Sequence, residues 1–211
     1  MVNVRGSRGN DVMTGPKYGG ATFYGGEGDD RLIAIAKLPS AHHAFYGGSG
    51  QDTLIGGGGR DTLDGGTGDD EIHGTGGRNL IFGGHGNDVI TDGDGSSTVH
   101  TGPGRNRVSL GGGNDVVHVG TGVNHIDPGS GAVRFVVTYG GVTRISVWDE
   151  TQIYDLSAWP APPQIARRAG GEVDLTLGLS VVRIAGVPAG HSVAAQIIQG
   201  AVPPAEGDSD D

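Results

Sequence analysis

Five aspartates, each closing a glycine-rich hexad, are the residues of this chain whose type and spacing best suit metal chemistry. They are Asp11, Asp30, Asp52, Asp70 and Asp88, separated by 19, 22, 18 and 18 residues. The hexads read GSRGND, GGEGDD, GGSGQD, GGTGDD and GGHGND. Calcium takes about six to eight oxygen ligands in flexible geometry, and a glycine-rich turn exposes carbonyls that no side chain screens. The spacing therefore predicts a column of calcium sites.

The same nine-residue unit, GGxGxDxUx with U a large apolar residue, also recurs between these hexads. From Gly47 to Val136 the frame continues unbroken for ten units. Their eighth residues are Leu54, Leu63, Ile72, Ile81, Ile90, Val99, Val108, Val117, Ile126 and Phe135. Four earlier units, 6–14, 16–24, 25–33 and 38–46, bring the total to fourteen, with insertions at Gly15 and at residues 34–37. The apolar row is thus kept more strictly than the acidic one.

The period predicts an all-β solenoid. Glycines in GGxGx can take left-handed turn conformations that residues with a Cβ resist, and the residues after the aspartate alternate as in a short strand. One inward residue per strand is too little for a single strand to be stable, so coils must stack. Two nonads per coil place each unit above the next but one, which gives about seven coils.

This stacking sorts the sixth residues onto two edges. The first edge carries Asp11, Asp30, Asp52, Asp70, Asp88, Asn106 and Asn124. The second carries Ala21, His43, Asp61, Asn79, Ser97, Asp115 and Val133, so no two aspartates are neighbours there. Asp61 and Asp115 could each furnish at most half a metal site. Either Arg60 or Arg78 neutralises Asp61, or these arginines point into solvent.

Composition narrows the class of protein. Glycine supplies 44 of 211 residues and only 35% are hydrophobic, which alone would suggest disorder; the fixed period argues against it. The net charge of −10 disfavours nucleic acid and favours cations. There is no cysteine for disulfides or thiolate metal sites. The first residues lack the apolar core of a secretory signal, and we expect no membrane span.

The nonads resemble the repeats-in-toxin family, the calcium-binding parallel β-roll modules of bacterial exoproteins. The resemblance implies a right-handed parallel β-roll in which calcium is held between stacked turns by the sixth-place aspartate and turn carbonyls. This role falls on the five spaced aspartates and on first- and fourth-place glycines, with Asp61 and Asp115 as lesser candidates. The glycines are Gly25, Gly28, Gly47, Gly50, Gly65, Gly68, Gly83 and Gly86.

After Val136 the nonad frame is lost, so we expect a roll over residues 1–136, a β-strand cap over 137–200 and an acidic disordered tail over 201–211. Alternating apolar runs at 142–148, 152–156, 172–177 and 180–187 are interpreted as antiparallel strands that close the open end of the roll. The segments 152–158 and 180–187 resemble those that follow the repeats in proteins exported by type I systems. We therefore expect a secreted or cell-surface protein without an N-terminal signal peptide.

No enzyme is expected. The HExxH zinc signature is missing, and Gly190-His191-Ser192-Val193-Ala194 only partly matches a nucleophile elbow. His100 and His118 should be neighbours on one sheet, where they could bind zinc or nickel or simply decorate the surface. The chain is interpreted as a calcium-binding protein that folds on calcium binding after type I export. Alternatives are the targeting module of a larger exoenzyme or adhesin, and a component that binds cell-surface polysaccharide.

Overall fold

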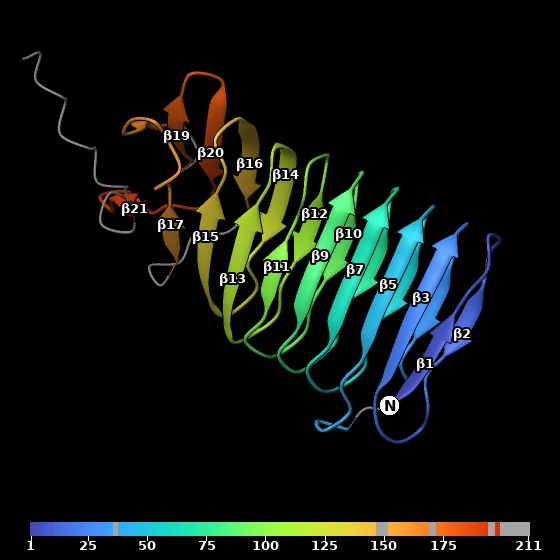
Figure 1. The fold of residues 1–211 in the computed structure, drawn as a ribbon. Coiled ribbons are helices and arrows are strands. Elements are labelled where there is room, and N and C mark those ends of the chain that lie inside the picture. The colour runs from blue at the N-terminus through green and yellow to red at the C-terminus, as the bar shows by residue number, and fades with distance from the viewer. Residues whose placement is uncertain (36–37, 147–151, 169–171, 194–196, 199–211) are drawn as a thin grey trace, which may run out of the picture.

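The structure is a computed structural model that describes residues 1–35, 38–146, 152–168, 172–193 and 197–198. It is an all-β parallel solenoid, as the period predicts, followed by a short antiparallel region; it has about eight turns, one more than the nonad count gives. The chain winds back and forth between two sheets that face each other, and each coil lies against the one before it (Figure 1). In the described part of the chain, no helix has the length and apolarity that crossing a bilayer requires.

One sheet contains ten strands. In spatial order they are β1 (Val2–Arg5), β3 (Ala21–Glu27), β5 (Ala44–Ser49), β7 (Thr62–Thr67), β9 (Leu80–His85), β11 (Thr98–His100), β13 (Asn114–Val119), β15 (Ala132–Val137), β17 (Ile153–Asp155) and β21 (Ile197–Ile198). We call it sheet A. All its strand pairs are parallel, since each connection passes through the opposite sheet.

The second sheet, sheet B, contains eleven strands. In spatial order they are β18 (Gln164–Arg167), β19 (Val173–Leu177), β20 (Ser180–Ile184), β16 (Gly141–Ile145), β14 (Gly122–Asp127), β12 (Arg107–Ser109), β10 (Val89–Thr91), β8 (Glu71–His73), β6 (Thr53–Ile55), β4 (Arg31–Ile33) and β2 (Val12–Thr14). Only β18, β19 and β20 form antiparallel pairs.

The strand registers confirm the two-nonad coil. Leu54 lies opposite Ile72 in sheet B, and Leu63 lies opposite Ile81 in sheet A, a separation of 18 residues in each case. The offset is 19 between Met13 and Leu32, and 22 between Leu32 and Leu54. The strands therefore keep their register on either side of the insertions at Gly15 and at residues 34–37.

The core is a thin row of eighth-place side chains. From Leu32 to Phe135 these residues are at most 1% exposed. The two that precede Leu32 are slightly more exposed, Met13 at 8% and Phe23 at 2%. Each fully buried aliphatic side chain contributes about 1.5–3 kcal/mol. Aromatic residues in successive coils stack on one another, with ring centroids 5.0 Å apart for Phe23 and Phe45. Stacking therefore supplies the core that no single coil can build.

Two of the strands expected to be antiparallel are in fact further coils of the roll. β16 pairs parallel with β14, and β17 pairs parallel with β15, so the solenoid continues past Val136. Continuation does not need the glycine turns, since alternating apolar residues keep Ile145 and Tyr154 fully buried in the row. Residues 147–151 and the acidic tail at 201–211 lie outside the described residues.

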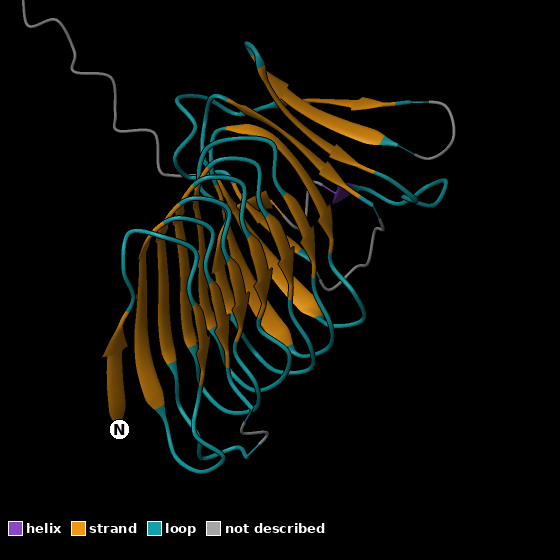
Figure 2. Cartoon of the chain, turned by 90° about the vertical axis from the view of Figure 1, so that its right-hand side faces the viewer, coloured by secondary structure: helices purple, strands orange, loops and turns teal. Residues whose placement is uncertain are grey.

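The antiparallel strands β18, β19 and β20 cover the end of sheet B and project beyond the last coils (Figure 2). β20 continues the parallel sheet against β16 and then pairs antiparallel with β19. Asp174 on β19 is 2% exposed and binds Arg168 and Arg183, which hold the pKa of its carboxyl below its ordinary value. At that end of sheet B the outermost described strand is therefore β18, not a coil of the solenoid.

Candidate metal sites on the first edge

The sixth-place side chains of the first edge tie each coil to the one before it. Oδ1 of Asp30, Asp52, Asp70 and Asp88 accepts the backbone N–H of the aspartate one coil earlier, at 2.8, 2.7, 2.8 and 3.1 Å. Asn106 continues this ladder by accepting from the N–H of Asp88 at 2.9 Å. The spacing of the nonads therefore places one carboxylate oxygen in the turn structure itself.

The other carboxylate oxygen has no partner. Oδ2 of Asp30, Asp52, Asp70 and Asp88 is buried and receives no hydrogen bond. The four residues are between 0% and 2% exposed. Burying a carboxylate oxygen without a hydrogen-bond partner costs free energy, so the four equivalent oxygens indicate a ligand that binds at each of them.

The partner must fit a space that only glycine leaves open. A Cβ built on Gly83 would lie 2.6 Å from Oδ2 of Asp88 and 2.6 Å from the carbonyl oxygen of Thr101 in the next coil. The two oxygens are therefore at most 5.2 Å apart, the sum of those distances. Gly25, Gly47 and Gly65 have equivalent neighbours, namely the Oδ2 of their own hexad and the first-place carbonyl of the next coil. Calcium at its usual 2.3–2.6 Å from each oxygen can bridge such a pair.

The second- and fourth-place glycines let the turns approach closely. Gly26, Gly48, Gly66 and Gly84 have φ between +100° and +123°, and Gly28, Gly50, Gly68 and Gly86 have φ between +111° and +139°. A side chain at most of these places would run into the backbone of the preceding coil. Gly28, Gly50, Gly68 and Gly86 thus belong to the stacked turns, while the first-place glycines border the unpaired oxygens.

Asp11 differs from the other four aspartates. Its Oδ2 accepts the backbone N–H of Ser7 at 2.6 Å and the hydroxyl of Ser7 at 3.0 Å. Ser7 replaces the second glycine of the hexad, so its side chain already partners the carboxylate. A metal at Asp11 would have to compete with these bonds, although Gly6 leaves the same space as the other first-place glycines.

The series ends above Asp88 for two reasons. Asn106 and Asn124 replace the acid, and the Nδ2 of each donates to a carbonyl of its own turn, Gly102 at 3.2 Å and Gly120 at 3.0 Å. Thr101 also replaces the first-place glycine, so its Cβ occupies the space that glycine leaves open below. At Asn106 and Asn124 the sixth-place side chains are consequently hydrogen-bonded without a metal.

Burial makes the column electrostatically unstable when it is ionised. It raises the pKa of Asp52 to about 6 and of Asp70 to about 7, and it raises the pKa of Asp30 and Asp88 as well. The backbone N–H that each carboxylate accepts opposes this effect, and neighbouring aspartates add to it. A divalent cation would stabilise the ionised form by replacing lost hydration and by screening the repulsion.

On the second edge, Asp61 has a similar environment. Its Oδ2 is buried and unpaired, and a Cβ on Gly56 would lie 2.9 Å from that oxygen and 3.2 Å from the carbonyl oxygen of Gly74. Burial raises the pKa of Asp61 to about 7. Of the two alternatives for Arg60 and Arg78, neutralisation of Asp61 is not seen, since no ion pair among the described residues includes either arginine.

Sequence reasoning missed Asp92, which takes the first place of a nonad where glycine is usual. Its Oδ1 accepts Nδ2 of Asn79 at 2.9 Å, and its Oδ2 is buried and unpaired. Asp115, one coil on from Ser97, also has an unpaired buried Oδ2, and burial raises its pKa to about 6. An acid in a glycine place was the signal that could have found Asp92.

His100 and His118 are neighbours on the outer face of sheet A, as predicted. They lie opposite each other on β11 and β13, and their rings stack with centroids 4.3 Å apart. Phe82 stacks on His100 from the other side at 4.7 Å. Within the described residues, no three acidic, histidine or cysteine side chains gather closely enough to hold a metal. The first-edge sites therefore depend on backbone carbonyls, which is a donor set that suits calcium.

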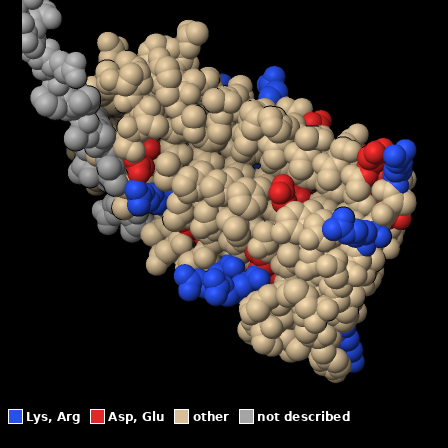
Figure 3. Space-filling model, in the orientation of Figure 1, with Lys and Arg blue, Asp and Glu red and all other residues tan. Residues whose placement is uncertain are grey.

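On the face shown in Figure 3, acidic side chains reach the surface as separate small patches. The family model of the RTX calcium-binding nonapeptide repeat matches the chain in four copies, over residues 18–34, 46–81, 64–99 and 91–126. The chain carries RTX repeats. The matched segments include the four first-edge aspartates with unpaired oxygens and their first-place glycines. Asp11 and its hexad lie outside the matched segments.

No curated protein matches the sequence of this chain. Among solved structures, the chain is similar to the extracellular lipase LipA from Serratia marcescens, with 15% identity and a TM-score of 0.37. The similarity covers 94% of this chain and 40% of the lipase chain. The chain therefore spans less than half the length of that protein. A likeness at this level is no basis for assigning the activity of the lipase to this chain.

Proposed function

We propose that this chain is a non-enzymatic RTX module that folds when calcium fills the first edge of its roll, outside the cell after type I export. The observation that carries the proposal is the row of four buried, unpaired Oδ2 atoms, each bordered by the first-place carbonyl of the next coil. Asp30, Asp52, Asp70 and Asp88 would supply the carboxylates, with Gly47, Gly65, Gly83 and Thr101 supplying carbonyls. Calcium would supply the positive charge that the buried column lacks.

The chain's own residues explain why folding and binding would be coupled. Each candidate site uses a carboxylate from one coil and a carbonyl from the next, so neither half exists before the coils stack. Without calcium, stacking brings acids together in a buried row. At submicromolar calcium the chain would stay unfolded and fit for export, whereas millimolar calcium would stabilise each filled gap by mass action. The difference in calcium concentration between compartments would then decide the folded fraction.

The test is a calcium titration of the chain followed by circular dichroism, with bound ions counted at saturation. We expect β-structure to appear with calcium and between three and five ions to bind per chain. Equal folding in excess chelator would contradict coupled folding. Eight or more ions would contradict the one-edge arrangement, because only a second complete column could hold them.

Export and absence of catalysis need separate measurements. Deleting the chain's C-terminal segment from residue 180 onward should abolish its appearance in the medium of a host that has a matching type I system, while cellular synthesis continues. Unchanged release of the truncated chain would contradict this route. For catalysis, the calcium-loaded chain should hydrolyse neither ester nor peptide substrates; turnover that Ser192→Ala abolishes would contradict the non-enzymatic assignment.

A further inference from the structure

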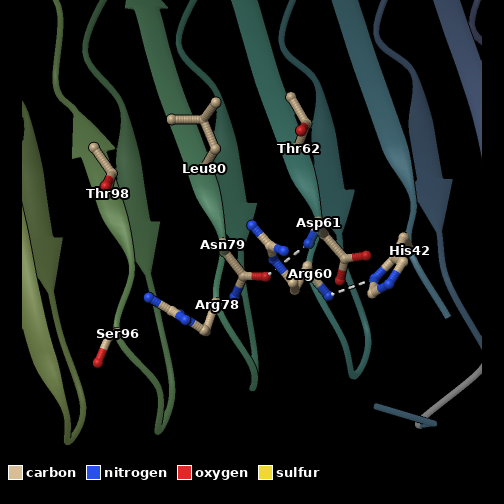
Figure 4. Close-up of a pocket in the computed structure, with 9 residues that line it drawn as sticks. All are labelled: His42, Arg60, Asp61, Thr62, Arg78, Asn79, Leu80, Ser96 and Thr98. Carbon is tan, nitrogen blue, oxygen red and sulfur yellow. Dashed lines mark hydrogen bonds between the residues drawn. The ribbon is translucent and has the colours of Figure 1, made fainter. Parts of the chain in front are cut away.

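A cationic pocket opens on the second edge of the roll. Arg60 and Arg78 occupy the fifth places of two stacked nonads and line a cavity of about 470 Å³. His42, Ser96, Thr62 and Thr98 also line it, so the cavity crosses four coils (Figure 4). Figure 4 shows both arginine side chains leaving the turn backbone in front of Asn79 and Asp61.

Arg60 and Arg78 occupy the same place in neighbouring coils (Figure 4) and have no counter-ion among the described residues. The residues that follow them, Asp61 and Asn79, stand one coil apart and are joined by a bond from the N–H of Asp61 to Oδ1 of Asn79. Adjacent strands lie about 4.8 Å apart, so the pocket brings two like charges onto adjacent coils, which is unfavourable. Among the described residues neither arginine forms an ion pair. Asp61 does not act as their counter-ion, because its Oδ2 is buried beside Gly56 and the carbonyl oxygen of Gly74.

The opposite edge has the reverse charge at the same places. Fifth-place residues of the first edge are Asn10, Asp29, Gln51, Asp69, Asn87, Arg105 and Val123. Those of the second edge are Gly20, His42, Arg60, Arg78, Ser96, Asn114 and Ala132. The first edge thus has two acids and a single arginine at this place, while the second has adjacent arginines and no acid. The two neighbouring arginines of the pocket thus have the opposite sign to the net charge of the chain, which is −10.

Asp61 and Asn79 also line the pocket, but Oδ1 of Asp61 accepts the N–H of His43 and its Oδ2 is buried. Two other polar side chains, His42 and Ser96, are set to donate hydrogen bonds. Nδ1 of His42 accepts the backbone N–H of Arg60 at 3.1 Å, so the neutral ring carries its proton on Nε2. Oγ of Ser96 accepts the N–H of Asn114 at 3.1 Å, which leaves the hydroxyl hydrogen to donate. Guanidinium groups can only donate, and their planar forks match carboxylate, sulfate and phosphate oxygens.

We propose that this pocket binds an oxyanionic group of a ligand between the guanidiniums of Arg60 and Arg78. The group is a carboxylate, a sulfate or a phosphate, and its negative charge would remove the repulsion between the stacked arginines. This site is separate from the calcium column, since its charged groups belong to the opposite edge. The proposal needs only the folded roll, and its failure would leave calcium binding at the first edge unaffected.

The test uses the full calcium-loaded chain, with arginine Nε–H and backbone amide shifts followed by NMR. Sodium sulfate, methyl phosphate and D-glucuronate are titrated separately at constant ionic strength, with sodium chloride as the reference. We expect saturable shifts at Arg60 and Arg78 with at least one oxyanion, and the three titrations identify which group the pocket prefers. Shifts that match those in chloride for all three anions would overturn the proposal.

Three variants make the result specific. R60Q/R78Q should weaken binding at least tenfold, and R60K/R78K, which keeps both charges but loses the forks, should weaken it less. R105Q is the matched control, because Arg105 holds the fifth place on the first edge without an arginine above or below it. Calcium-dependent dichroism verifies that each variant folds. Equal weakening in R105Q and R60Q/R78Q would also overturn the site.

Discussion

Replacing Asp70 by Asn should change stability in opposite directions with and without calcium. Oδ1 of Asp70 accepts the N–H of Asp52 at 2.8 Å, and an asparagine oxygen can keep that bond, as Asn106 does for Asp88 at 2.9 Å. What Asp70→Asn removes is the charge on the unpaired Oδ2. The variant therefore separates the turn-forming role of the side chain from its proposed metal-binding role.

The magnitudes follow from those two roles. In chelator, the amide can donate to a carbonyl of its own turn, as Asn106 does to Gly102 at 3.2 Å, and a net hydrogen bond contributes about 1 kcal/mol. Loss of one calcium site at a concentration about 100 times its dissociation constant costs about 2.7 kcal/mol. We expect Asp70→Asn to be about 1 kcal/mol more stable than the parent chain in chelator and roughly 2 kcal/mol less stable in calcium.

In calcium at about 10 mM, stability is measured by urea unfolding followed by circular dichroism, with bound calcium counted in parallel. In chelator, where the chain is expected to be largely unfolded, stability is compared through the fraction of β-structure seen by dichroism. Asp70→Asn should lose about one ion. Asn106→Asp is the control, because Thr101 fills its first-place space; it should gain no ion and be destabilised in both conditions. Equal destabilisation of Asp70→Asn in calcium and chelator would refute the reasoning.

Three further outcomes are expected. In chelator, lowering the pH from neutral should stabilise the roll, because burial raises the pKa of Asp70 from 3.8 to about 7. The contribution of such an acid to stability is fully present below its unfolded-state pKa and is lost as the pH rises through its folded-state pKa. Dichroism that shows less β-structure at pH 5 than at pH 7.5 would contradict this. Gly65→Ala would place a Cβ less than 3.0 Å from Oδ2 of Asp70 and should lower calcium stoichiometry, whereas Gly9→Ala, with no atom nearer than 4.0 Å, should not. Phe135→Ala should cost about 3–5 kcal/mol in calcium, measured by urea unfolding, since Phe135 is fully buried in the core row.

The sequence allowed the roll and its register to be predicted because one physical requirement repeats every nine residues. Each coil needs one large apolar residue per strand, and the row from Leu54 to Phe135 keeps that requirement without exception. The extra coils β16 and β17 were not predicted, since they keep the apolar residue but lack the GGxGxD hexad. Pattern recognition by turn motifs therefore underestimates how far a solenoid extends.

The site was predictable at the level of residue type but not of individual oxygens. Spacing placed Asp30, Asp52 and Asp70 in one column, yet only coordinates show that Oδ1 is used by the turn and Oδ2 is free. Asp11 has the same spacing, but Ser7 takes its free oxygen, which is a local hydrogen bond that no period encodes. The lack of an ion pair at Asp61 likewise depends on side-chain direction.

The hydrogen bonds between sixth-place side chains and backbone N–H groups all run the same way along the solenoid. Each coil donates an N–H to a side chain of the coil that follows it in sequence, as Asp52 does to Asp70. The fifth-place bonds run the opposite way, since each coil donates an N–H to a side chain of the coil before it, as Gln51 does to Asp29. Removing a coil from either end would therefore leave one N–H without its side-chain acceptor. The two ends of the stack are both templates, and an incoming coil finds a sixth-place acceptor at one end and a fifth-place acceptor at the other.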